Sequence, residues 1–165
     1  ALIQTGCEHD CDMMIVQAVD KVNKRQKANF VSKIVNRFGE DLKGLTFAVW
    51  GLAFKPKTND MREAPAIYVI EELLKRGALI RGFDPKAMDT AKQLFGEKIL
   101  YAQNAYDALS EADAMLLLTE WNEFRRPDYD KRAKLLKQKI IFDGRNQYDK
   151  AKLISKGFEY YNIGE

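Results

Sequence analysis

The stretch LTFAVWGLAFKPKTNDMREAPAIYVIEELLKRG, residues 45–77, decides the fold class. It opens with a continuous apolar run, residues 45–50, which is typical of a strand buried on both faces. A long loop follows, and from residue 66 the apolar side chains recur at helical spacing up to residue 76. Pro65 fits the first turn of that helix, where its missing N–H costs nothing. A strand, a loop and a helix in this order predict the first half of a parallel βαβ unit.

The same alternation continues to the end of the chain. Further apolar runs of strand length lie at residues 78–83, 98–101, 114–118, 139–142 and 158–161. Helical patterns separate them at residues 88–95, 105–109, 129–136 and 149–155. This alternation predicts an α/β fold, a Rossmann-like three-layer domain with a mostly parallel sheet covered by helices.

The first 44 residues differ from the rest. Between Asp12 and Phe38 there is no Pro and no Gly, and apolar residues recur at the i, i+3, i+4, i+7 positions of one helix face. Gly39 is well placed to end that helix, which would be about 40 Å long. A helix of this length usually links domains or packs against a second subunit. We therefore divide the chain into 1–44 and 45–165, and expect a homodimer through the helix.

Composition excludes several classes of protein. The 165 residues are 46% hydrophobic and 31% charged, with two cysteines and a net charge of +3. These values argue against intrinsic disorder, a disulfide scaffold and a nucleic-acid partner. No apolar run approaches the ~20 residues of a membrane span. Because the chain begins at Ala1 without Met and without a signal peptide, we expect it to be processed, cut, or one piece of something longer.

Three cations follow strands at the sheet edge where α/β proteins bind ligands. Lys55 and Arg62 lie in the loop after the first strand, which exceeds the roughly two to six residues of common βα loops. Arg145 follows the strand at 139–142. If the topology is right, the three converge near a helix N-terminus and form an anion site, with phosphate the usual anion. The alternative is that they are ordinary solvated loop residues.

Other motifs are absent or ambiguous. The first strand is followed by Gly51 alone, not by G-x-G-x-x-G, and no phosphate-loop motif occurs, so we do not expect the sheet to hold a dinucleotide in the usual way. Asp84 with the Pro that follows favours a turn, although an acid after the second strand can bind a ribose. Trp121 and Phe124 could stack on a base, but a place in the core or in a contact between domains is favoured.

Cys7, His9, Asp10, Cys11 and Asp12 form a cluster near the start of the chain. On a helix the two cysteines would share one face, which could suit a metal. Structural metal sites are normally built from four Cys or His ligands, however, and the chain has only these two cysteines and one histidine. We therefore predict no metal site, no strained disulfide and no nucleophile here, but free thiols in a reducing compartment, the cytoplasm.

Four ordered motifs carry a family resemblance. Residues 51–66, GLAFKPKTNDMREAPA, closely resemble the G-L-A-F-K-x-x-T-x-D-x-R-x-S/A-P signature of the UDP-glucose/GDP-mannose dehydrogenase family. Residues 22–27 (VNKRQK), 119–121 (TEW) and 142–146 (FDGRN) resemble further motifs of that family in the same order. Asn59 stands where many members have Asp, which does not disturb the match.

The resemblance implies which part of a larger enzyme this is. Family members join an N-terminal NAD-binding domain, a helical central region that builds the dimer, and a C-terminal Rossmann-like domain that binds the nucleotide sugar. This chain resembles the last part, 45–165, preceded by the end of the central helix. The catalytic cysteine lies in a G-G-x-C-x-P-K-D segment that these residues do not contain, so no catalytic residue is assigned. The implied reaction is the oxidation of UDP-glucose to UDP-glucuronate by two NAD.

The resemblance also implies roles for four residues. Phe54 and Lys55 are expected to meet the UDP-sugar, Arg145 to make a second substrate contact, and Arg62 to reach the NAD bound mainly by the missing domain. Two alternatives stay open: another nucleotide-sugar dehydrogenase, acting on UDP-N-acetylmannosamine or GDP-mannose, and a stand-alone binding or dimerisation module without activity. A receiver-like α/β domain is disfavoured because its acidic pocket would lie where this chain has a basic loop.

Overall fold

The computed structural model of the protein describes residues 5, 8–9 and 12–164. Within this part of the chain six parallel strands form one sheet in the order β3-β2-β1-β4-β5-β6. They are β1 (Thr46–Trp50), β2 (Leu79–Phe83), β3 (Leu100–Tyr101), β4 (Ala114–Leu117), β5 (Ile140–Asp143) and β6 (Glu159–Asn162). This is the strand order of doubly wound dinucleotide-binding folds, with the switch point between β1 and β4. The predicted fold class is confirmed.

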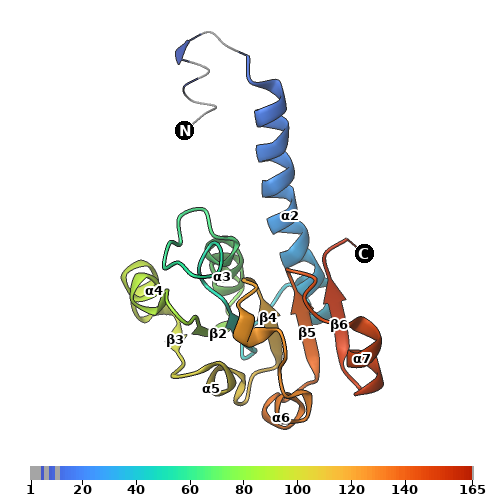
Figure 1. Ribbon diagram of the computed structural model, residues 1–165. Helices are drawn as coiled ribbons and strands as arrows, with labels where there is room; N and C mark the ends of the chain where they lie inside the picture. The colour runs from blue at the N-terminus through green and yellow to red at the C-terminus, as the bar shows by residue number, and fades with distance from the viewer. Residues whose placement is uncertain (1–4, 6–7, 10–11, 165) are drawn as a thin grey trace.

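Helices cover the sheet on both faces (Figure 1). They are α2 (Met14–Phe38), α3 (Pro65–Lys75), α4 (Met88–Phe95), α5 (Ala105–Leu109), α6 (Tyr129–Leu135) and α7 (Lys150–Ser155). Every predicted helix is present with its ends within two residues. Two short 3₁₀ turns, η1 (Gly96–Lys98) and η2 (Asn122–Phe124), were not predicted. No helix in the described residues is long and apolar enough to cross a membrane.

The sheet separates two apolar cores, and strand alternation sorts residues between them. Phe47 and Val49 of β1 point to the core beneath α2, α3 and α4. Ala48 and Trp50 point to the opposite core, beneath α5, α6 and α7. All four residues of β4 are buried as well. The continuously apolar runs of the sequence are therefore strands covered on both faces, as predicted.

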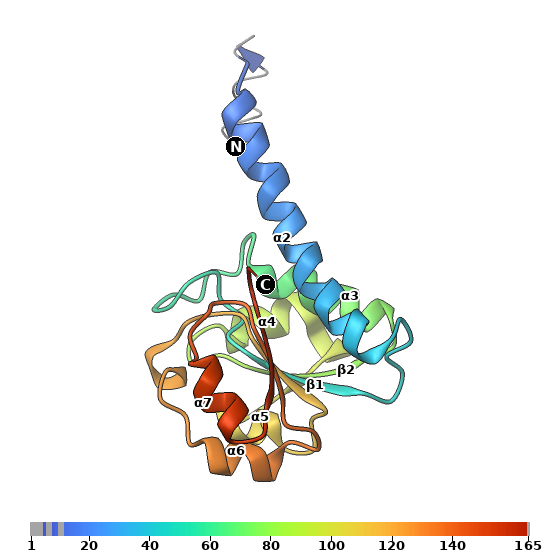
Figure 2. The same cartoon turned by 90° about the vertical axis from the view of Figure 1, so that its right-hand side faces the viewer.

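Helix α2 is divided between the domain and solvent. Its C-terminal half buries Phe30, Val31 and Ile34 against the first core. It ends at Gly39, whose φ of 93° lies in the left-handed region and whose N–H donates to a carbonyl of the last turn. The N-terminal half projects away from the sheet (Figures 1 and 2), and there Ile15 is 81% exposed. The apolar stripe read from the sequence thus covers the core along only half of its length.

Arg132 of α6 is fully buried in the second core. Its guanidinium lies 4.3 Å from the ring centroid of Trp50 and 4.6 Å from that of Tyr148, and Nη2 donates to the Tyr148 hydroxyl. No ion pair in the described part of the chain includes it. Burial raises the pKa of Tyr148 to about 12, so that hydroxyl remains neutral. Aromatic rings therefore stabilise this cation in place of a carboxylate.

Gly51, directly after β1, is required by both conformation and space. Its φ is 89°, and a Cβ built on it would lie 2.5 Å from Cβ of Thr119. We predict that Gly51→Ala lowers the free energy of unfolding by about 3 kcal/mol or more, because strain and a clash with backbone add together. Gly39→Ala is the matched control, since it has a similar φ and no atom within 4 Å, and it should cost only about 1 kcal/mol. Urea unfolding of both variants tests this, and equal losses would contradict it.

Candidate functional site

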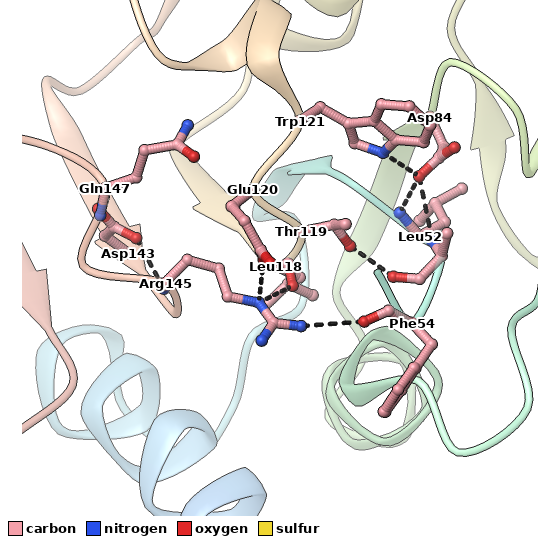
Figure 3. A network of polar contacts seen from close by, with 11 residues as sticks. Leu52, Phe54, Asp84, Leu118, Thr119, Glu120, Trp121, Asp143, Arg145 and Gln147 are labelled. Carbon is pink, nitrogen blue, oxygen red and sulfur yellow. Dashed lines mark hydrogen bonds and ion pairs between the residues drawn. The ribbon is translucent and has the colours of Figure 1, made fainter. Parts of the chain in front are cut away.

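A buried carboxylate, Asp84 after β2, ties the segments that follow three strands. Its Oδ2 accepts hydrogen bonds from the backbone N–H groups of Leu52 and Ala53, at 2.8 and 3.0 Å, and from Nε1 of Trp121 at 3.0 Å (Figure 3). Its Oδ1 accepts from the backbone N–H groups of Lys86 and Ala87. The predicted turn is confirmed, and it also holds the loop after β1 and the segment after β4.

The Asp84 contacts bear on dinucleotide binding. In nucleotide-binding sheets the N–H groups after the first strand face the pyrophosphate. Here the carboxylate of Asp84 already occupies those of Leu52 and Ala53. Trp121 is buried beside Asp84, and the ring centroid of Phe124 lies 4.8 Å from that of Trp50. Both aromatic residues therefore belong to the core. The residues of this crevice therefore do not fit a bound NAD.

A second buried carboxylate, Asp143 at the end of β5, shapes the turn that carries Arg145. Its Oδ1 accepts from the Arg145 N–H at 2.8 Å. Its Oδ2 accepts from the N–H groups of Gln147 and Tyr148 and from the Tyr160 hydroxyl. Burial, followed by the neighbouring Asp143 charge, raises the pKa of Tyr160, so its hydroxyl stays a donor to that charge. The backbone of Arg145 is consequently fixed.

The Arg145 guanidinium joins the loops of three strands (Figure 3). Nε donates to the carbonyl of Leu118 at 2.7 Å and lies 3.1 Å from Oε2 of Glu120. Nη2 donates to the carbonyl of Phe54 at 3.2 Å. Within the described part of the chain no hydrogen bond involves Nη1. Nε and Nη2 of the guanidinium are thus held by the protein, and Nη1 is available to donate to a ligand.

Arg145 lines a cleft of about 820 Å³ between α2 and the carboxyl ends of the strands. Phe54 and Lys55 line it too, and Phe54 is 48% exposed. The other lining residues come from α2, α3 and the segments after β1, β4, β5 and β6: Asp20, Asn23, Lys24, Gln26, Lys27, Phe30, Glu63, Pro65, Val69, Leu118, Glu120, Gly144 and Ile163. The structure therefore brings together the three residues that the sequence suggested for substrate contact.

Helix α2 contributes cations that our interpretation of the sequence missed. Lys24 pairs with Asp20 at 2.8 Å, and Lys27 lies 3.7 Å from a carboxylate oxygen of Glu63. The signal was available, because Asp20, Lys24 and Lys27 recur at helical spacing on one face. Lys55 takes part in no ion pair among the described residues. The ammonium of Lys55 and Nη1 of Arg145 are therefore the cationic groups best placed to receive an anion.

Arg62 does not join this cleft. Its side chain is 89% exposed and pairs with Asp60 at 2.7 Å, and this contact lowers the pKa of Asp60 to about 2. It lines a separate hollow with Thr90 and Gln93 of α4. The expected convergence of three cations is therefore found for Lys55 and Arg145 only.

The candidate metal cluster cannot be placed in full. Cys7, Asp10 and Cys11 lie outside the described residues. Among the residues that are described, no group of three or more His, Cys, Asp and Glu side chains could hold a metal ion.

Comparison with known proteins gives consistent results. The model of the UDP-glucose/GDP-mannose dehydrogenase family, UDP binding domain, matches residues 48–150. The chain is 40% identical to a UDP-glucose 6-dehydrogenase of Rhizobium meliloti and 37% identical to the UDP-glucose 6-dehydrogenase TuaD of Bacillus subtilis. Each alignment covers 99% of this chain, but only 37% and 35% of the relative. The chain thus spans about a third of the length of the curated relatives it matches.

A solved structure shares the fold over nearly the whole chain. The UDP-glucose dehydrogenase of the archaeon Pyrobaculum islandicum superposes with a TM-score of 0.79 at 30% sequence identity. The match covers 98% of this chain and 34% of that one. Helix α2 and the sheet domain are therefore both represented in a larger protein of known structure.

We predict that Asp84→Ala lowers the free energy of unfolding by about 3 kcal/mol, because buried N–H groups lose their acceptor. Asp89→Ala on α4 is the matched control, since its side chain is 94% exposed, and it should cost no more than about 0.5 kcal/mol. Urea unfolding followed by tryptophan fluorescence measures both. A loss at Asp84 no greater than that at Asp89 would show that the hydrogen bonds around this carboxylate do not stabilise the domain.

Proposed function

The chain belongs to the UDP-glucose/GDP-mannose dehydrogenase family, and we propose that it forms the nucleotide-sugar-binding part of a NAD-dependent UDP-glucose 6-dehydrogenase. The observation that carries the proposal is the cleft in which Lys55 and Nη1 of Arg145 stand beside the exposed ring of Phe54. The names of the relatives at 37–40% identity support UDP-glucose as the sugar nucleotide. Residues 1–44 are then the end of a central helical region, and 45–165 the UDP-sugar-binding domain.

Lys55, Arg145 and Phe54 each have a role suited to binding a nucleoside diphosphate sugar. Lys55 offers a point charge and Arg145 a planar donor, and the two together match the charges of a diphosphate. Phe54 covers an apolar face of the ligand and excludes water. Arg62, which is exposed in the same loop and lies outside the cleft, would contact a NAD held by another domain.

In the whole enzyme the reaction is the oxidation of UDP-glucose to UDP-glucuronate through two hydride transfers. NAD would be the hydride acceptor, and the Asp84 contacts support the proposal that it binds on a domain other than this one. This chain binds and orients the sugar nucleotide, and alone it has no dehydrogenase activity. We place the enzyme in the cytoplasm, where the thiols of Cys7 and Cys11 stay reduced.

The projecting half of α2 supports a homodimer. Met14, Ile15, Val19 and Val22 are large apolar residues between 44% and 81% exposed. They belong to the N-terminal half of α2, the half that projects beyond the sheet domain (Figure 2). A second copy of the chain, packing its own α2 against these residues, would remove them from water.

We predict that Lys55→Gln weakens UDP-glucose binding by about 2 kcal/mol, roughly 30-fold in Kd, because a charged contact to phosphate is lost. Lys57→Gln is the control, since Lys57 belongs to the same loop and is exposed but does not line the cleft. Its Kd should change less than about twofold. Isothermal titration calorimetry on the 165-residue chain measures both, and equal losses would remove Lys55 from the site.

We also predict that Ile15→Glu converts a dimer to a monomer, because it places a charge in the apolar contact. Gln17→Glu adds the same charge on the opposite face of α2 and should leave the dimer intact. Light scattering coupled to size-exclusion chromatography gives the mass of each variant. A monomeric parent chain at high concentration would overturn the dimer proposal.

A further inference from the structure

Glu120 is an unexpected residue in a cleft that binds an anion. Its Oε2 is buried and lies 3.1 Å from Nε of Arg145, and no hydrogen bond in the described part of the chain involves that oxygen (Figure 3). The side chain is only 36% exposed and lines the cleft. A carboxylate is therefore held beside the guanidinium that should receive phosphate.

The other cleft carboxylates have different surroundings. Asp20 pairs with Lys24 on one helix face, and Glu63, whose side chain is 90% exposed, faces Lys27. Solvent screens charges in such positions. Glu120 is less exposed and is attached to the group that contacts the ligand, so its charge acts there with less screening. Its effect on a bound anion should exceed that of Glu63.

Glu120 consequently limits the negative charge that a ligand can carry in the cleft. A diphosphate esterified at both ends carries one negative charge on each phosphorus. A free terminal phosphate carries about −1.5 to −2 at neutral pH, so a nucleoside diphosphate without its sugar has a further charge. An anion that accepts a hydrogen bond from Nη1 of Arg145 contacts the same guanidinium that Glu120 contacts. The Glu120 carboxylate therefore repels any additional negative charge on that anion.

We propose that Glu120 is a specificity-determining residue, which favours a nucleoside diphosphate esterified at both ends over one with a free terminal phosphate. The proposal rests on the proposed function and assigns a selective role within that site. Discrimination through a repulsive element of this kind lowers affinity for the wrong ligand without a new contact to the right one. A residue that only held Arg145 in place would instead influence both ligands equally.

Calorimetric titration of the 165-residue chain with UDP-glucose and with UDP, at pH 7.5 and low salt without divalent cations, separates these roles. In Glu120→Gln we expect the Kd for UDP to fall about fivefold and that for UDP-glucose to change less than about twofold. Glu120→Ala should shift the ratio of the two constants in the same direction, even if it weakens both. Glu63→Gln, the matched control, should leave the ratio unchanged.

Each other outcome has a defined meaning. If Glu120→Gln changes both constants by the same factor, or produces no gain for UDP, the specificity role is wrong while the proposed function stands. If Glu63→Gln shifts the ratio as much, total cleft charge and not Glu120 sets the preference, and the proposal is overturned. A parent chain that binds neither ligand would reject the proposed function itself.

Discussion

The contact on which the rest of the domain depends is that between the Asp84 carboxylate and the N–H groups that follow β1. Parallel strands end with backbone donors that need an acceptor, and in many such sheets a bound phosphate provides it. Here the chain provides its own anion. The loop after β1 is thereby fixed, and the carbonyl of Phe54, a few residues on, is the one that receives Nη2 of Arg145. The buried carboxylate after β2 thus helps to determine where the Arg145 guanidinium lies.

The cleft is assembled from two sources with different rigidity. Its floor comes from the ends of β1, β4 and β5, which Asp84 and Asp143 hold through several hydrogen bonds each. Its wall comes from α2, which meets the domain through Phe30 and its buried neighbours and through the contact of Lys27 with the exposed Glu63. The backbone of the floor and the Arg145 side chain have fixed partners, whereas Lys24 and Lys27 on the wall pair with the more exposed carboxylates of Asp20 and Glu63. Positioning of a ligand therefore depends chiefly on the floor.

The sequence was sufficient for the fold and for part of the site. Apolar runs buried on both faces and the change of period after residue 44 predicted the strands and helices, because burial imposes those patterns directly. That Lys55 and Arg145 line the same cleft followed from the rule that parallel strands end at one edge of the sheet. Arg62 does not join the cleft, because its hydrogen bonds to Asp60 direct the guanidinium away from it. The partner of Glu120 could not be predicted, because it depends on how two loops distant in sequence meet.

Helix α2 has a consequence for how binding events communicate. Asp20 and Lys27 of the cleft wall and Ile15 of the projecting half lie on one uninterrupted helix without Pro or Gly. Such a helix transmits rotation along its length with little bending. The cleft and the projecting half thus share one element, so any change that shifts α2 relative to the sheet also moves the side of the cleft that α2 forms.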